Sequence, residues 1–411
     1  MWDAIIVGGG AAGFFGAITC AEGLGPSGKV LLLERGREVL RKVKVSGGGR
    51  CNVTHACPEP RPLSAHYPRG QRALIGPFHR FGPREIIAWF EGRGVALKTE
   101  ADGRMFPVTD DSQTIIDCLL GAADDAGVLV RTRAGVAQIE ALEGGEGEAS
   151  AFALTLESGE VLQARSVLLA TGGTQTGPGA GLARSLGLAL EPPVPSLFTF
   201  HVHDARLDDL QGLSVEDVAT SVPDERLSAR GPLLITHWGM SGPAILKLSA
   251  WGARALHERG YRFELEVDWL PGVDARARLV ALRQEWARRQ IQARSPFDAI
   301  PKRLWQRLAE GAQIDEAQTW AQLSRAGLAA LDDQLRRARF EVVKKSTFKD
   351  EFVTCGGVST DAIDMRTMQA RHLPGLFVAG ELMDVDGITG GFNFQNAWTS
   401  GFLAGQAMSA R

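Results

Sequence analysis

The chain has 411 residues, which is too long for one ordinary domain and suggests two or three. Its formal net charge of −3 and its 44% hydrophobic content are those of a globular protein and exclude a disordered or strongly basic chain. The start of the chain lacks a signal pattern and no apolar run reaches about 18 residues, so we expect neither secretion nor a membrane span. Five scattered cysteines favour a reducing cytoplasm over a disulfide framework.

Residues 3–34 predict a strand, a glycine-rich loop, a helix and a second strand. Gly8, Gly10 and Gly13 form the pattern G-x-G-x-x-G directly after an apolar run, as a tight turn against a pyrophosphate requires. Glu34 follows the second strand, where a carboxylate can accept hydrogen bonds from a ribose. The alternative, a glycine-rich turn without a ligand, is disfavoured by the strand, the spacing and the acid together. The predicted phosphate contacts are the backbone groups of Gly8, Gly10, Ala11, Ala12 and Gly13.

Further elements are predicted before residue 191, where we expect the first cofactor-binding segment to end. A glycine-rich stretch at 46–52 precedes a proline-rich one at 58–83. The patterns predict helices at 83–93, ended by Gly94, and at 109–126, strands at 134–141 and 151–157 around a Gly/Glu-rich turn at 144–148, and a strand at 166–170. The last strand runs into Thr171-Gly172-Gly173, as expected of a buried parallel strand that ends at a ligand site.

A second domain is predicted after the prolines at 192, 193 and 195. Alternating stretches at 197–202, 215–222 and 263–267 predict antiparallel strands, and the pattern then becomes helical. The run 375–381 predicts a last strand that rejoins the N-terminal sheet. The expected domains are a first cofactor segment at 1–191, a β-rich domain at 192–273, a helical insert at 274–338, a return through the β-rich domain at 339–351 and a second cofactor segment at 352–411.

The C-terminal segment distinguishes between the two dinucleotides, FAD and NAD, that the N-terminal unit could hold. An apolar strand ends in Gly380-Glu381, followed by Asp384, Asp386 and a glycine-rich start of a helix at 387–391. Carboxylates can accept from ribityl hydroxyls, and a helix N-terminus would stabilise negative charge on a reduced flavin. The plain alternative is a strand followed by a capped helix. Together with residues 3–34, the segment favours FAD.

At these segments the chain resembles the BaiN/RdsA-like family of FAD-dependent oxidoreductases, also described as YhiN-like flavoproteins and including aminoacetone oxidase-like enzymes. The segments that carry the resemblance are Gly8–Gly13, Ser46–Asn52, Gly103–Pro107, Ala170–Gly173, Thr236–Pro243 and Gly380–Gln395. The resemblance implies an α/β fold of the two-dinucleotide-binding-domain flavoprotein type. A Rossmann-like domain would hold non-covalent FAD, and an inserted β-barrel-like domain would carry a helical insertion.

The predicted cofactor contacts extend beyond the N-terminal loop. They are Glu34, Arg35, Lys42, Ser46, Gly47, Gly48, Gly49, Arg50, Cys51, Asn52, Val136, Thr171, Gly172, Gly173, Gly380, Glu381, Asp384, Gly391, Phe392 and Asn393. Two departures from the family pattern stand out. Residues 174–181 lack its usual serine, aromatic-proline pair and glycine-rich turn, and Phe392 and Phe394 replace tyrosine and leucine. The first departure bears on substrate choice, and the second removes a phenol near the flavin.

The candidate catalytic residues are His237, Arg104 and Cys355, with His237 as the proton carrier because neutral imidazole shuttles protons near pH 7. Each has a structural alternative. Cys51 and Cys57 are spaced unlike the cysteine pair of disulfide reductases, so a catalytic disulfide is disfavoured. His201 and His203 alternate like a metal pair but have no third ligand nearby, so no metal is expected.

These patterns predict an oxidoreductase that passes a hydride from NAD(P)H through FAD to a small unsaturated or carbonyl substrate. No second G-x-G-x-x-G follows a strand, so NAD(P)H would visit transiently. Charge leaves an alternative open: residues 35–93 carry twelve Lys/Arg against four Asp/Glu, and residues 275–309 carry nine against two. A basic helical insert would suit a flavin-dependent RNA-modifying enzyme, as in one branch of the resembling family, or would be a solvated helix face. A non-enzymatic flavin-binding module is the third possibility, and the sequence leaves the oligomeric state open.

Overall fold

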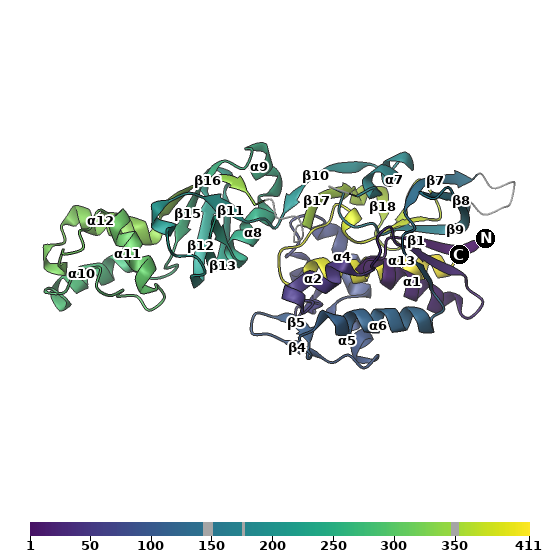
Figure 1. Cartoon of the computed structure of the whole chain (residues 1–411), viewed down its shortest axis with the longest axis horizontal. Helices are drawn as coiled ribbons and strands as arrows, with labels where there is room; N and C mark the ends of the chain where they lie inside the picture. Colours follow the sequence, from purple (N-terminus) through teal and green to yellow (C-terminus); the bar gives the residue numbers. More distant parts are fainter. Residues whose placement is uncertain (143–150, 175–176, 347–352) are drawn as a thin grey trace. The chain divides into compact units, whose positions relative to one another are not determined.

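The computed structural model describes residues 1–142, 151–174, 177–346 and 353–411, and the chain forms two compact units (Figure 1). Unit 1 comprises Met1–Val194 and Val353–Arg411, and unit 2 comprises Pro195–Phe352. The α/β fold class predicted from the sequence, with an inserted barrel and a helical insertion, is confirmed. The finer domain limits expected from the sequence stay a prediction. Among the described residues, no helix is long and apolar enough to cross a membrane.

Unit 1 is built on a nine-stranded sheet with a parallel centre. The strand order is β18-β19-β20-β9-β1-β2-β6, with β8 also paired to β9 and β7 paired to β8. The strands are β1 (Trp2–Val7), β2 (Val30–Leu33), β6 (Leu129–Arg131), β7 (Val136–Leu142), β8 (Ala151–Leu156), β9 (Val161–Leu169), β18 (Ile363–Asp364), β19 (Gln369–Ala370) and β20 (Leu376–Val378). The predicted turn at 144–148 lies outside the described residues.

The central strands β2, β1, β9 and β20 are parallel. Parallel strands are found where both faces of a sheet are covered. All four residues of β2 are buried, as are the last four of β1, and such continuous apolar runs are typical of parallel strands. The register places Val7 of β1 beside Leu169 of β9, and Leu169 beside Val378 of β20. The predicted last strand therefore rejoins the N-terminal sheet, and the residues that follow these three strands start at the same edge.

Helices and short strands complete unit 1. The helices are α1 (Ala11–Leu24), α2 (Arg41–Gly49), α3 (Pro60–Ser64), α4 (Gln71–Arg80), α5 (Pro83–Glu91), α6 (Ser112–Asp125), α7 (Gly179–Ser185) and α13 (Phe392–Ser409), with single turns η4 (Thr360–Ala362) and η5 (Gly380–Leu382). The short strands are β3 (Thr54–His55), β4 (Leu97–Thr99) and β5 (Arg104–Pro107) in one sheet, and β10 (Leu190–Ser196) with β17 (Val353–Val358) in another.

Two predicted helices have different ends in the structure. The helix predicted to end at Gly94 stops at Glu91, with Gly92 as its cap. The helix predicted from residue 109 begins at Ser112, because the Asp111 carboxylate accepts a hydrogen bond from the Gln113 N–H and so caps the first turn.

Unit 2 is a closed six-stranded barrel with helices inserted between its last two strands (Figure 1). The barrel order is β11-β14-β13-β12-β15-β16, and the predicted antiparallel pairing is confirmed. Its elements are β11 (Phe200–Val202), η1 (Ala205–Leu207), β12 (Ser214–Val222), η2 (Pro223–Glu225), β13 (Leu227–Thr236), β14 (Gly239–Ser241), α8 (Pro243–Trp251), α9 (Ala253–Glu258), β15 (Phe263–Asp268), α10 (Ala275–Glu285), α11 (Lys302–Gly311), η3 (Trp320–Gln322), α12 (Arg325–Arg336) and β16 (Ala338–Lys345). One continuous apolar core joins barrel residues such as Phe340 to insert residues such as Trp305.

Candidate cofactor and active site

The loop between β1 and α1 has the close packing and the open face that a pyrophosphate site needs. A Cβ on Gly13 would lie 1.9 Å from the Gly8 carbonyl oxygen, and one on Gly8 (φ +118°) would lie 2.3 Å from the Ala170 oxygen. A Cβ on Gly10 would meet nothing within 4 Å, so the backbone there faces open space. The N–H groups of Ala11 and Ala12 start α1 and have no intrahelical acceptor, which suits an anion.

Glu34 lies beside this loop and is held by two backbone donors. Its Oε2 accepts from the Gly9 N–H at 2.8 Å, and its Oε1 accepts from the Gly36 N–H at 2.6 Å. A carboxylate has about four acceptor sites, so capacity remains for ribose hydroxyls. The neighbouring Arg35 forms an exposed ion pair with Glu157 at 3.0 Å. Val136 is buried at the start of β7.

The segment Ser46–Asn52 forms a second glycine-lined wall. Gly47, Gly48 and Gly49 have φ values of +58°, +69° and +84°, which break the helix and would strain other residues. A Cβ on Gly48 or Gly49 would meet nothing within 4 Å. This run therefore presents bare backbone to open space, as a close approach to a ligand requires.

Cys51, at the end of that run, is an inert buried thiol. Burial raises its pKa to about 12, so the reactive thiolate is scarce at neutral pH. Cys51 and Cys57 are both free, and so are the other three cysteines.

Asn52 joins the glycine run to the C-terminal helix. With its amide placed to suit its neighbours, its nitrogen donates to the Thr54 and Met105 carbonyls at 3.0 and 3.2 Å, and its oxygen accepts from the Gly391 N–H at 2.9 Å. The Trp398 indole N–H donates to the Val53 carbonyl at 2.9 Å. The Asn52 side chain is thus hydrogen-bonded to backbone groups of the protein. Its role as a flavin contact stays a prediction.

Four chain segments meet at Glu381. Its Oε1 accepts from the Thr354 N–H of β17 at 2.9 Å, and its Oε2 pairs with the Lys42 ammonium of α2 at 2.5 Å. A Cβ on Gly173 would lie 2.8 Å from Glu381 Oε1, so only a glycine allows this approach. Thr171 and Gly172 precede this contact, directly after β9. The predicted contacts of the first and last cofactor segments are therefore neighbours.

The loop before α13 is held by a buried ion pair. Asp386, expected from the sequence among the carboxylates that suit a ribityl chain, has 0% side-chain exposure and binds Arg69 through both oxygens, Oδ1 at 2.5 Å from Nε. Arg69 is itself 13% exposed. Asp386 is thus a structural anchor for this loop, in which Asp384 also lies; the Asp384 N–H donates to the Val358 carbonyl.

Side chains at the start of α13 brace that loop. The Phe392 ring stacks on the rings of both His55 and His66, with centroids at 4.8 and 4.4 Å. The Asn393 amide exchanges two 2.9 Å hydrogen bonds with the backbone of Gly387. Gly391 (φ +91°) caps the helix, where a Cβ would lie 2.5 Å from the Thr54 carbonyl.

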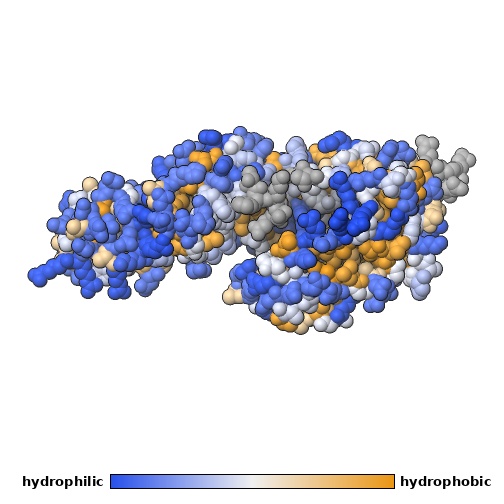
Figure 2. Space-filling model, in the orientation of Figure 1, coloured by the Kyte–Doolittle hydropathy of each residue, from blue (hydrophilic) through white to orange (hydrophobic). Residues whose placement is uncertain are grey.

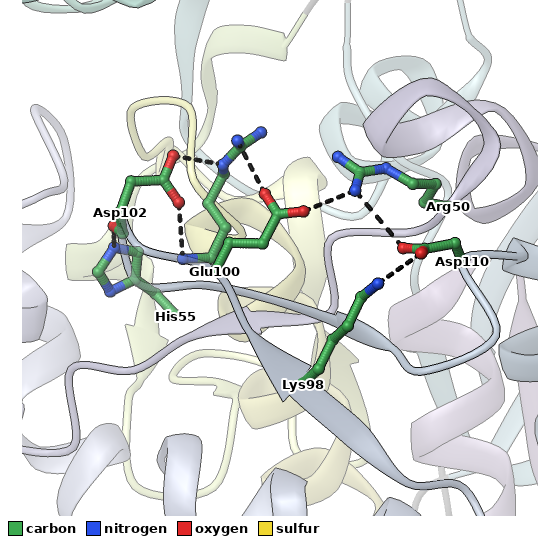
Figure 3. Close-up of polar contacts among 7 residues, drawn as sticks. Arg50, His55, Lys98, Glu100, Asp102 and Asp110 are labelled. Atoms are coloured by element: carbon green, nitrogen blue, oxygen red, sulfur yellow. Dashed lines mark hydrogen bonds and ion pairs between the residues drawn. The ribbon is translucent and has the colours of Figure 1, made fainter.

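Arg104 belongs to a ladder of alternating charges. Figure 3 labels its other members, which are Asp102, Glu100, Arg50, Asp110 and Lys98. Arg104 binds Asp102 at 2.6 Å and Glu100 at 3.0 Å, and Glu100 binds Arg50 at 2.6 Å. Arg50 reaches Asp110 at 3.5 Å. A hydrogen bond from Lys98 lowers the pKa of Asp110. Both arginines also lie over the Phe106 ring. The Arg104 guanidinium is thus matched by protein carboxylates, and its catalytic role stays a prediction.

The other two candidate catalytic residues lie in different units. Cys355 is buried in β17, next to Thr354. His237 is exposed in the two-residue turn between β13 and β14 of unit 2. The neighbouring Trp238 faces His201, with ring centroids at 6.4 Å. His203 lies just past the end of β11, and the part of the chain that the structure describes contains no cluster of His, Cys, Asp and Glu suited to a metal ion.

Two observations show that the residues of unit 1 suit an extended dinucleotide. Bare backbone faces open space at Gly10, Gly48, Gly49 and Gly172. Among the described residues of unit 1, the buried atoms Thr171 Oγ1, Thr174 Oγ1 and Asn396 Oδ1 are without a hydrogen-bond partner. Thr174 and Asn396 are not among the site residues predicted from the sequence. Asn396 could have been predicted from the sequence, because it lies one helical turn after Phe392, a predicted cofactor contact, on a buried helix.

The chain is similar over nearly its whole length to known proteins. A family model described as the HI0933-like protein Rossmann domain matches residues 2–407. The chain is 32% identical to a ribosomal RNA dihydrouridine synthase of Escherichia coli, with 100% of this chain and 98% of the relative covered. It is 29% identical to a 3-dehydro-bile acid delta(4,6)-reductase of Clostridium scindens, with 99% and 98% covered. Its fold is similar to that of a 3-ketosteroid-delta4-(5alpha)-dehydrogenase from Rhodococcus jostii, with a TM-score of 0.54, 14% identity and coverage of 100% and 98%.

Proposed function

The chain belongs to the HI0933-like Rossmann-domain family and is an FAD-dependent oxidoreductase, and we propose that it reduces a carbon–carbon double bond conjugated with a carbonyl group. One observation carries the proposal. The carboxyl ends of β1, β9 and β20 are aligned, so the G-x-G-x-x-G loop, the Thr171–Gly173 turn and the Gly380–Glu381 segment start from one edge of the sheet. Ligands of open α/β sheets bind at this edge.

The proposed bond type is supported by what the two relatives are named for. A dihydrouridine synthase saturates the ring double bond of uridine, which is conjugated with a carbonyl. A delta(4,6)-reductase of a 3-dehydro bile acid saturates double bonds conjugated with the 3-oxo group. Both reactions need a hydride at one carbon, a proton at the next, and stabilisation of the negative charge that develops on the carbonyl oxygen. The same requirements would apply to a small unsaturated substrate of this chain.

The proposed roles follow from positions in the chain. When bound, FAD supplies the hydride. The loop Gly8–Gly13 and the start of α1 bind the pyrophosphate, and Glu34 orients the ribose. The N-terminus of α13 at Gly391 favours negative charge near the flavin ring. We assign to His237 the transfer of the proton to the substrate carbon.

The proposed electron donor is NAD(P)H, bound transiently. The described residues hold one G-x-G-x-x-G loop between a strand and a helix, so a reduced nicotinamide would approach the flavin where substrate does. The expected cytoplasmic location is compatible with a donor found there and stays a prediction.

The test is anaerobic turnover with NADH or NADPH and a panel of acceptors. We expect cyclic enones to oxidise NAD(P)H faster than the matching saturated ketones or isolated alkenes, because only the conjugated carbonyl delocalises the developing charge. The saturated product identifies the reaction. Equal rates with enones and isolated alkenes, or no NAD(P)H oxidation with any enone, would contradict the proposal.

A second candidate function, reduction of a base in RNA, is favoured by the surface of the helical insert. Five exposed cations there form no ion pair among the described residues: Arg288, Arg289, Arg294, Lys302 and Arg303. Arg289 and Arg294 also lie over the half-buried Trp286 ring, at 5.0 and 5.9 Å. Figure 2 shows a mainly hydrophilic surface over α10, α11 and α12 on the face drawn. Cations beside an aromatic ring are suited to nucleic acid.

Salt dependence separates the two candidates. An RNA substrate predicts binding that weakens steeply with salt, because phosphate contacts release counterions. Replacing Arg289 and Arg294 with glutamate should then reduce RNA binding while enone reduction is unchanged. The matched control is Arg84→Glu, at an exposed arginine of unit 1. Salt-independent binding, or equal loss in the control, would contradict the RNA candidate.

A further inference from the structure

Asn396 carries an unusual unsatisfied group inside α13. The residue is 2% exposed and lies one helical turn after Phe392. Its Nδ2 donates to the Gly380 carbonyl at 3.5 Å, the upper limit of a hydrogen bond. Its Oδ1 is buried and has no hydrogen-bond partner in the part of the chain that the structure describes. A buried acceptor without a donor costs free energy, so the neighbourhood is incomplete as it stands.

The other buried polar side chains around it are satisfied. Gln395 accepts from the Thr54 hydroxyl at 2.5 Å and donates to Thr399 at 3.0 Å. The Thr399 hydroxyl donates to the Phe81 carbonyl at 2.8 Å. Ser400 accepts from the Gly380 N–H at 2.9 Å and donates to the Asn396 carbonyl at 2.6 Å. The unpaired acceptor is therefore specific to Asn396 and is not a general feature of this helix.

The position of Asn396 relates it to the cofactor site. Gly380, its contact, has a φ of +72° and follows β20 by one residue. A Cβ on Gly380 would lie 2.9 Å from Cβ of Ala12, in the first turn of α1. Gly380 also precedes Glu381, where the segments of the cofactor site meet. Asn396 thus contacts the backbone of Gly380, which packs against the first turn of α1 and leads into Glu381.

We propose that Asn396 positions the FAD by accepting a hydrogen bond from a hydroxyl of the ribityl chain. The inference rests on the proposed function, because it needs FAD in unit 1. An amide oxygen accepts only, so the group it meets must be a donor. The pyrophosphate offers acceptors alone, whereas the ribityl chain next to it carries hydroxyl donors. A buried water is the competing partner, and it would satisfy Asn396 with or without FAD.

The test compares Asn396→Leu with Gln395→Leu, a change of similar shape at the adjacent satisfied residue. Thermal unfolding of the apoprotein and the Kd for FAD, from quenching of flavin fluorescence, are measured for each variant. We expect Asn396→Leu to leave the apoprotein melting temperature unchanged or higher, because an unsatisfied acceptor is removed, and to raise the Kd about tenfold. Gln395→Leu should lower the melting temperature, because the Thr54 hydroxyl loses its acceptor.

FAD analogues that lack single ribityl hydroxyls test the contact in the wild-type protein, so this result does not depend on the folding of a variant. The wild-type protein should bind one analogue about tenfold more weakly than FAD, and Asn396→Leu should bind that analogue and FAD alike. Equal binding of all analogues by the wild type, or an unchanged Kd in Asn396→Leu, would overturn the inference and indicate a water. Loss of melting temperature equal to that of Gln395→Leu would assign Asn396 a structural role. Failure of the wild type to bind FAD would contradict the proposed function itself.

Discussion

At the scale of single residues, backbone groups of the protein fix the orientation of a predicted cofactor contact. Glu34 shows how: the Gly9 and Gly36 N–H groups hold its two oxygens at 2.8 and 2.6 Å. Because both donors are backbone groups, the carboxylate keeps one orientation beside the phosphate-binding loop. A ribose then meets an acceptor that has little conformational freedom left to lose.

Glu34→Ala should weaken FAD binding by about tenfold or more, because charge-assisted hydrogen bonds are roughly twice as strong as neutral ones. The measurement is the Kd for FAD by equilibrium titration of apoprotein. Glu59→Ala is the matched control, since Glu59 is an exposed glutamate of unit 1 that pairs with Arg84 and is not among the predicted cofactor contacts. An unchanged Kd in Glu34→Ala would remove this residue from the ribose site.

Asp386→Ala should lower the free energy of unfolding by about 3–5 kcal/mol, because it leaves the guanidinium of Arg69 buried without its carboxylate. Chemical denaturation of the apoprotein measures this. Arg84→Ala breaks a pair whose side chains are 68% and 65% exposed and should cost less than about 1 kcal/mol. Similar losses in both variants would show that the Arg69–Asp386 pair does not anchor the loop before α13.

Cys51 should resist thiol reagents at pH 8 in the folded protein. Burial raises its pKa to about 12, so the thiolate that reacts is rare at this pH, and labelling should speed up as the pH rises. Cys57 is the internal comparison, because it is half-buried and should be labelled first. Peptide mapping after timed labelling distinguishes the two. Faster modification of Cys51 than of Cys57 would contradict the buried, neutral thiol.

At the scale of elements, the crossing of α1 and α13 brings the two ends of the chain together. A Cβ on Gly401 would lie 2.4 Å from the Ala12 carbonyl oxygen, and one on Gly405 would lie 2.6 Å from the Gly16 oxygen. Only glycines allow two helix backbones to approach so closely. The spacing sets the distance between the first turn of α1 and the cap of α13, both of which are proposed FAD contacts.

Gly401→Ala should therefore destabilise the protein by about 1–3 kcal/mol and weaken FAD binding, because the backbone opposite cannot move aside without displacing α1. Gly121→Ala is the matched control, since Gly121 is exposed within α6 and a Cβ there meets nothing within 4 Å. That control should gain up to about 1 kcal/mol from helix propensity. Denaturation curves of both variants test this, and a neutral Gly401→Ala would refute the close crossing.

Elements were predictable from the sequence where the local pattern determines them. The buried strands β1, β9 and β20 have apolar runs that end in turn residues, and the structure confirms them. The short strands β3, β4 and β14 have two or three residues each, too few for any periodicity, and depend on partners far along the chain. The start of α6 was placed too early because the Asp111 cap decides it, whereas the apolar pattern extends beyond the cap.

At the scale of the whole molecule, the sequence predicted which segments form the site, but it did not predict which residues each side chain contacts. The glycines that face open space, such as Gly10 and Gly48, lie in motifs that are visible in the sequence. The partner of Asp386 was not visible in the sequence, because Arg69 lies 317 positions away along the chain and meets Asp386 only in the folded protein. The family resemblance drawn from those motifs is confirmed. The substrate and the electron donor stay proposals.

The most direct test of the central claim is a single turnover of the reduced flavin without oxygen. The protein, loaded with FAD and reduced by one equivalent of NAD(P)H, is mixed with a cyclic enone while the flavin absorbance is followed. The account predicts return of the yellow oxidised flavin together with one equivalent of the saturated ketone, and no such return with the isolated alkene of the same skeleton. Flavin that stays reduced with every conjugated acceptor, RNA included, would contradict it.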